Sequence, residues 1–181
     1  MVKLKKTKDN IIKKTEELGR EYEARYKGCG QCTFLAIIDA LRWGGLELIP
    51  ADMEEKLYPG ISMLTAGICM TGEGTCGAIA SSVVALGLAL GVSRDSADVA
   101  AARYAAASIK DSLLEKCYRE YRSILCKDIQ RKYFGKAWDL TDDDMAHEFL
   151  GITRGCVIMQ TAKWTVECIL DEFEKGNVKG G

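Results

Sequence analysis

The stretch from residue 61 to residue 93 contains one charged residue, Glu73, in a chain in which 28% of residues are charged. Within it, residues 74–93 are apolar and rich in Ala, Gly and Ser, which allow neighbouring helix backbones to approach closely. The sequence therefore predicts a buried central helix, preceded by a turn at 71–74. A transmembrane helix is the alternative, but four glycines and the lack of flanking aromatic or charge signals favour a soluble core, without membrane insertion.

The rest of the chain predicts an all-α fold, because there are only two prolines and few alternating apolar and polar stretches. We expect a single domain over 9–175, a helical bundle of about six to eight helices around the small-residue-rich central helix. Residues 1–8 are expected to form a basic disordered tail, and 176–181 a flexible C-terminal tail.

Capping residues and breaks place the individual helices. Asp9 or Asn10 is expected to cap the first helix and Thr75 the central one, and the capping sequence of residues 141–144 is expected to begin the penultimate one. The expected helices cover about 9–26, 29–44, 50–57, 75–92, 95–121, 123–135, 141–150 and 156–174.

The net charge and the N-terminal sequence predict which kinds of partner the protein binds and where it is located. The net charge of −1 gives no indication of nucleic-acid binding. The first 27 residues carry nine Lys/Arg and five Asp/Glu, which predicts a solvated helix or, as the alternative, a surface for an acidic partner. Without an apolar signal-peptide run, a cytoplasmic location is expected. The sequence specifies no redox partner protein and leaves a homo-oligomer open.

The chain has eight cysteines, and four of them are expected at helix starts: Cys29, Cys76, Cys126 and Cys156. In the cytoplasm such a set indicates metal binding or redox chemistry rather than a disulfide framework. Helix N-termini favour thiolates through the helix dipole and free N–H groups. We therefore predict that the four cysteines meet in one pocket near the start of the central helix.

The chain resembles the C_GCAxxG_C_C family of redox-active proteins, named for four cysteines and a Cys-Gly-Ala-x-x-Gly motif. The matching segments are 28–31, 73–81, 124–127 and 155–157. Ser81 stands where the motif has glycine, which predicts looser helix packing there. The resemblance implies a redox protein with a bound cluster, for electron transfer or redox sensing.

The residues themselves leave three kinds of chemistry open. Four thiolates suit an iron–sulfur cluster, which we favour, or a tetrahedral zinc in a non-catalytic module. The third alternative is a metal-free thiol–disulfide protein in which Cys76 and a neighbour cycle. Cys32 and Cys69 are two additional candidate ligands because each lies close in sequence to a motif cysteine, whereas Cys117 and Cys168 are expected to pack in the core. No catalytic residue is assigned.

Overall fold

The computed structural model describes residues 3–91, 94, 99–153 and 156–178, without the side chain of Cys156. The helices are α1 (Lys8–Tyr26), α2 (Cys29–Gly44), α3 (Ala51–Ser62), α4 (Gly77–Leu90), α5 (Val99–Ile109), the π-helical segment η1 (Lys110–Leu114), α6 (Glu115–Tyr121), α7 (Cys126–Phe134), α8 (Asp143–Ile152) and α9 (Cys156–Glu174). Since α5, η1 and α6 run on without a break, these segments form eight continuous helices. The described residues contain no strand, so the predicted all-α fold is confirmed.

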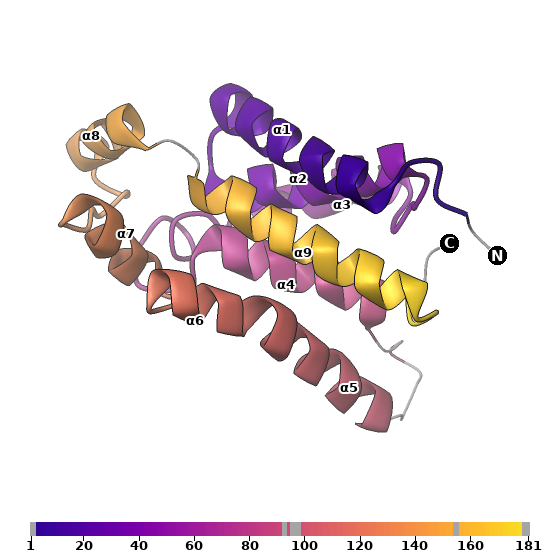
Figure 1. Cartoon of the computed structure of the whole chain (residues 1–181). Helices are drawn as coiled ribbons and strands as arrows, with labels where there is room; N and C mark the ends of the chain where they lie inside the picture. Colours follow the sequence, from indigo (N-terminus) through magenta and orange to yellow (C-terminus); the bar gives the residue numbers. More distant parts are fainter. Residues whose placement is uncertain (1–2, 92–93, 95–98, 154–155, 179–181) are drawn as a thin grey trace.

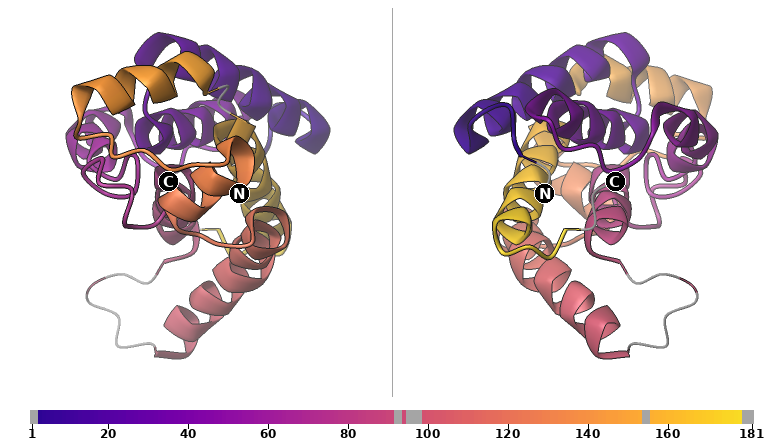
Figure 2. Two further views of the ribbon diagram at one scale, coloured as in Figure 1. Left: turned by 90° about the vertical axis from the view of Figure 1, so that its left-hand side faces the viewer. Right: turned by 90° about the vertical axis from the view of Figure 1, so that its right-hand side faces the viewer.

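Four helices form the centre of the bundle. α2 packs on α1, α4 and α9, and α9 also contacts α1 and α4 (Figure 1). The long helix of α5, η1 and α6 lies on the side of the bundle opposite α1, as the end-on views show (Figure 2). Along α4, Ala78, Ile79, Ala85, Leu86 and Ala89 are fully buried. The apolar stretch that dominates the sequence is thus the central helix, as predicted.

Several helix boundaries differ from the prediction. Thr7, rather than Asp9 or Asn10, caps α1, because its hydroxyl accepts a hydrogen bond from the N–H of Asn10. α3 continues through Pro59 to Ser62 instead of ending before Tyr58. α4 is capped by Cys76 and not by Thr75, whose backbone instead forms an isolated antiparallel bridge with Leu125.

The chain ends contact the bundle where the structure describes them. Leu4 packs against the core, and the N–H of Lys5 donates a hydrogen bond to the carbonyl of Gly44. At the other end, Val178 packs on the core and the N–H of Asn177 bonds the carbonyl of Glu172. Residues at both ends of the described chain therefore contact the packed helices.

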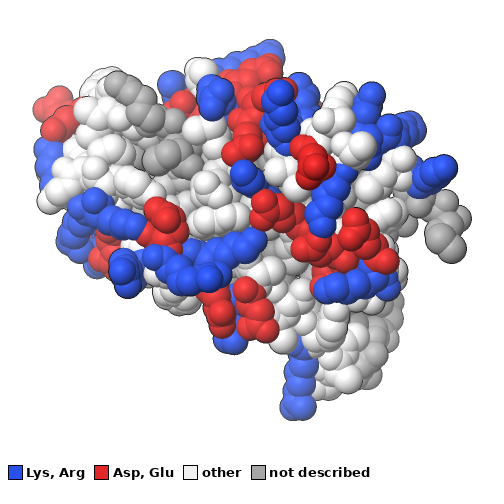
Figure 3. Space-filling view, viewed as in Figure 1, with Lys and Arg blue, Asp and Glu red and all other residues white. Residues whose placement is uncertain are grey.

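Charged side chains of both signs are interspersed over the face shown in Figure 3. Some form ion pairs between helices, such as Lys116 with Glu167 at 3.0 Å and Arg42 with Glu54 at 2.6 Å. No helix in the described ranges is both long and apolar enough to cross a membrane.

Glu172, on α9, forms hydrogen bonds with the long helix and with the C-terminal segment. Its buried carboxylate accepts hydrogen bonds from Tyr104 at 2.8 Å, Asn177 at 2.8 Å, Lys175 at 2.7 Å and Ser108 at 3.4 Å. Burial alone would raise the pKa of Glu172, but the bonds from Lys175, Asn177 and Tyr104 lower it to about 2. The folded protein therefore holds this carboxylate in its charged form.

Glu172→Gln is expected to lower the free energy of unfolding at pH 7 by on the order of 1–2 kcal/mol, because it weakens bonds to a charged acceptor. The pKa of Glu172 is lower in the folded than in the unfolded chain, so its contribution is present above about pH 4.5 and is lost as pH falls towards about 2. Urea unfolding from pH 7 to 2 checks this. The exposed Glu174→Gln should change little, and equal pH profiles for wild type and Glu172→Gln would contradict the assignment.

Candidate redox site

The four motif cysteines stand at helix starts, as predicted. Cys29 is the first residue of α2 and Cys126 the first of α7, while Cys76 caps α4. The backbone of Cys156 begins α9, but its side chain lies outside the described part of the structure. The starts of these helices gather at one end of the molecule, on the left in Figure 1.

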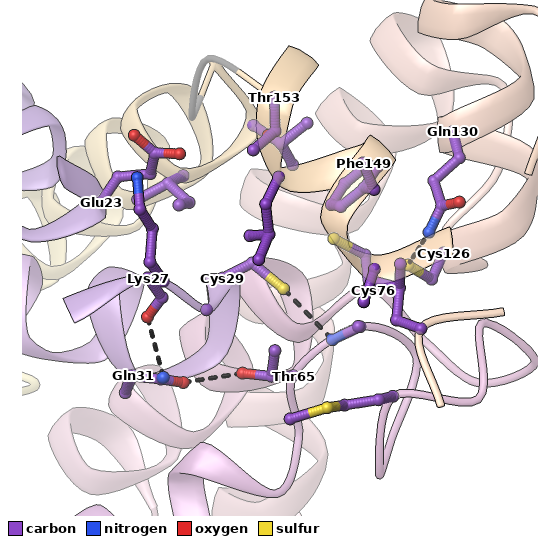
Figure 4. A pocket seen from close by; sticks show the side chains of 18 of the residues that line it. Glu23, Lys27, Cys29, Gln31, Thr65, Cys76, Cys126, Gln130, Phe149 and Thr153 are labelled. Carbon is purple, nitrogen blue, oxygen red and sulfur yellow. Dashed lines mark hydrogen bonds between the residues drawn. The ribbon is translucent and has the colours of Figure 1, made fainter. Parts of the chain in front are cut away.

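A cavity of about 500 Å³ lies at this end, and Cys29, Cys76 and Cys126 all line it. They come from α2, α4 and α7 and surround the same space (Figure 4). Val157 and Ile158, which follow Cys156 in α9, also line it. The structure thus brings together three of the four predicted side chains, and the position of the fourth sulfur stays a prediction.

The thiols of Cys29 and Cys76 are neighbours in the wall of the cavity, and each shifts the pKa of the other. The neighbouring Cys76 thiol lowers the pKa of Cys29, burial opposes this effect, and N–H groups of Ala66, Gly77 and Ala78 lower the pKa further. The neighbouring Cys29, together with burial, raises the pKa of Cys76 well above its usual value. The first proton that leaves the pair therefore comes from Cys29, whose Sγ lies beside the N-terminus of α4, where N–H groups stabilise a thiolate.

Gly77, in the central motif, makes room for this pair. A Cβ atom at position 77 would lie 2.7 Å from the Sγ of Cys29, 2.7 Å from the carbonyl oxygen of Leu64 and 3.0 Å from the backbone nitrogen of Gly30. Two of these three atoms are backbone, which cannot move aside easily. The close approach of α2 and α4 at the sulfur therefore requires glycine.

The connection between α3 and α4 wraps around the site in an unusual conformation. Five successive residues have positive φ: Ala66, Gly67, Ile68, Cys69 and Met70. Non-glycine residues adopt this conformation at a cost, and it is often found at functional sites. It points the N–H of Ala66 at the Sγ of Cys29, at 3.4 Å. The strained turn thereby supplies one of the donors that stabilise the Cys29 thiolate.

Cys126 accepts a hydrogen bond from Gln130, a residue that had not been singled out from the sequence. The buried amide of Gln130 donates from Nε2 to the Sγ of Cys126 at 3.2 Å, and its Oε1 accepts from the N–H of Trp138 at 2.8 Å. Burial nevertheless raises the pKa of Cys126 to about 12. The i, i+4 spacing from Cys126 on one helix could have indicated this contact.

Two further polar side chains of the cavity lining, Thr65 and Gln31, had not been singled out from the sequence. The hydroxyl of Thr65 donates to the Oε1 of Gln31 at 2.7 Å and accepts from the N–H of Gly30 at 3.2 Å. The Nε2 of Gln31 donates to the carbonyl of Lys27 at 2.8 Å (Figure 4). These bonds join the start of α2 to the loop after α3, and so fix Cys29.

The two additional candidates do not line the cavity. Cys32 is buried on the side of α1, where its thiol bonds the carbonyls of Tyr22 and Lys27. Cys69 is exposed on the strained turn. Cys117 and Cys168 are buried in the core cluster, and Ser81 is fully buried in α4.

Comparison with known proteins shows which family this chain matches. Residues 27–168 match the family described as "Putative redox-active protein (C_GCAxxG_C_C)". The chain belongs to this family. The match contains all four cysteines of the C_GCAxxG_C_C motif and the cavity-lining parts of α2, α7 and α9. Neither the curated proteins nor the solved structures gave a match to this chain.

Proposed function

We propose that this member of the C_GCAxxG_C_C family is a thiol–disulfide redox protein whose working pair is Cys29 and Cys76. The observation that supports this most strongly is that both thiols line one cavity, with the Sγ of Cys29 against Gly77, the residue that follows Cys76. Of the alternatives left open by the sequence, this geometry favours a cycling dithiol of Cys76 and a neighbour, and it indicates Cys29 as that neighbour.

The reaction of the pair is a two-electron exchange. Oxidation forms the Cys29–Cys76 sulfur–sulfur bond, breaks both S–H bonds and releases two electrons and two protons. Thiol–disulfide chemistry proceeds through attack by a thiolate. The proton affinities of the two thiols make Cys29 the attacking sulfur and leave Cys76 protonated until the second step.

Disulfide mapping tests the proposal. Mild oxidation of the reduced protein with diamide, followed by alkylation, digestion and mass spectrometry, is expected to yield one intramolecular disulfide between Cys29 and Cys76. Dithiothreitol should restore both thiols. A protein in which this pair stays reduced while other cysteines oxidise, or in which the product is an intermolecular disulfide of the exposed Cys69, would refute it.

A second candidate is the iron–sulfur cluster, and the donor chemistry of the site favours it. Cys29, Cys76 and Cys126 bring three thiols to one cavity, and thiolates are the ligands such clusters take. N–H groups directed at a sulfur, as from Ala66 to Cys29, are also typical of cluster ligands. Bound there, a cluster would supply one-electron transfer. Cys156 would be the fourth ligand.

Metal analysis separates the two candidates. Among the described residues, no three His, Cys, Asp or Glu side chains stand close enough to share one ion, a statement that does not extend to the Cys156 side chain. The protein is purified without oxygen, and its iron, sulfide and zinc contents are then determined. Near-stoichiometric iron and sulfide would support the cluster, zinc alone would support the metal-binding module, and a metal-free protein would support the dithiol.

A further inference from the structure

The cavity beside the thiol pair is larger and more apolar than a disulfide needs. It holds about 500 Å³, and its lining includes Met63, Met70, Ile129, Phe134, Phe149 and Leu150. Cavities of this size with apolar and aromatic walls and a few polar groups are typical of sites for small molecules. The thiol pair therefore lies at the wall of a space that fits an apolar ligand.

Several polar side chains that line the cavity are already engaged in hydrogen bonds with neighbouring groups. Gln31 bonds Thr65 and the carbonyl of Lys27, and Gln130 bonds Cys126. The charged residues of the described lining are Glu23 and Lys27, which have opposite signs and lie side by side (Figure 4). Lys27 is exposed and Glu23 partly exposed. The buried part of the cavity is thus suited to an uncharged ligand.

We propose that the cavity binds apolar organic hydroperoxides, which Cys29 reduces to alcohols with Cys76 as the resolving thiol; this inference rests on the proposed dithiol function. A nucleophilic thiol with a second thiol in contact requires a substrate whose attacked atom carries a leaving group, as in peroxides and disulfides. A charged peptide disulfide would have to lose its hydration in an apolar cavity. An organic hydroperoxide presents an apolar body and a small reactive end.

The reaction balances within the pair. The Cys29 thiolate attacks the terminal peroxide oxygen, the O–O bond breaks, and the alkoxide takes a proton to become the alcohol. Cys29 is then a sulfenic acid. The Cys76 sulfur attacks the Cys29 sulfur, the S–S bond forms, and the hydroxyl leaves with a proton as water. In sum, two thiols and one hydroperoxide give one disulfide, one alcohol and one water.

Selectivity between two peroxides tests the ligand class. The reduced protein is mixed with cumene hydroperoxide or with hydrogen peroxide, and loss of the Cys29 and Cys76 thiols is followed by quenched alkylation and mass spectrometry. Because burial of the aromatic body contributes binding energy that hydrogen peroxide lacks, cumene hydroperoxide should react on the order of tenfold faster or more. In Cys76→Ser, dimedone should trap the sulfenic acid on Cys29.

Filling the cavity provides a second test. Ala146 lines it from α8, so Ala146→Leu should slow cumene hydroperoxide about tenfold or more relative to hydrogen peroxide. The same change at Ala106, exposed on α5, should affect neither rate. Circular dichroism confirms that both variants fold.

The outcomes separate the hydroperoxide site from the dithiol function on which it rests. If diamide forms the Cys29–Cys76 disulfide but both peroxides react equally, or Ala146→Leu changes neither rate, the hydroperoxide site is refuted and the dithiol function stands. If no oxidant joins Cys29 to Cys76, both are refuted. Selectivity for cumene hydroperoxide that Ala146→Leu removes and Ala106→Leu keeps supports the site.

Discussion

Cys29→Ser is expected to abolish the reversible intramolecular disulfide, because Cys76 then has no partner sulfur. Cys29 is also the sulfur that the N–H of Ala66 and the neighbouring Cys76 thiol stabilise as a thiolate. The serine hydroxyl can occupy the same space but cannot form a disulfide. Thiol counting before and after diamide, with mass spectrometry of the peptides, measures the loss, which should exceed about a hundredfold in rate.

Cys32→Ser is the matched control, since it makes the same change one turn along α2. The Cys32 thiol bonds the carbonyls of Tyr22 and Lys27, bonds that a hydroxyl can replace. This variant should keep the disulfide and any metal content. Both variants are made with Cys69→Ser, which removes an exposed thiol. Loss of the couple in Cys32→Ser, or its survival in Cys29→Ser, would show that the working pair is wrongly assigned.

Gly77→Ala is expected to destabilise the protein by about 2–3 kcal/mol and to disturb the thiol pair. The added methyl group would lie 2.7 Å from the Sγ of Cys29 and from the carbonyl oxygen of Leu64, so α2 or the loop after α3 must shift. Overpacking of this kind typically costs 1–3 kcal/mol. Urea unfolding measures the stability, and the rate of Cys29 alkylation measures the disturbance of the pair.

Gly87→Ala, in the same helix, serves as the control. A Cβ atom there meets nothing within 4 Å, and the position is exposed. Because alanine favours the helical conformation over glycine, this variant should be more stable by up to about 1 kcal/mol. If Gly77→Ala were as stable as Gly87→Ala, with unchanged Cys29 reactivity, the close approach at Gly77 would not be a requirement of the site.

The sequence by itself determined the helices and the identity of the key thiols. The uncharged stretch of residues 74–93 predicted a buried central helix rich in small residues, and α4 (Gly77–Leu90) is that helix, with most of its residues buried. Breaks before Cys29, Cys126 and Cys156 placed these cysteines at helix starts, which the structure confirms. These are local properties, since capping and helical periodicity act over a few residues.

Only the tertiary structure decided which groups meet. The contact of Cys29 with Cys76 joins α2 to α4 over a long stretch of chain, and no periodicity encodes such a distance. Thr75 lost its expected role as the cap because its backbone pairs with Leu125, a contact made by a segment far along the chain. Gln130, by contrast, reaches Cys126 across one turn of α7, a local contact that the i, i+4 spacing could have indicated. The cavity likewise exists only once the starts of α2, α4, α7 and α9 have been packed together.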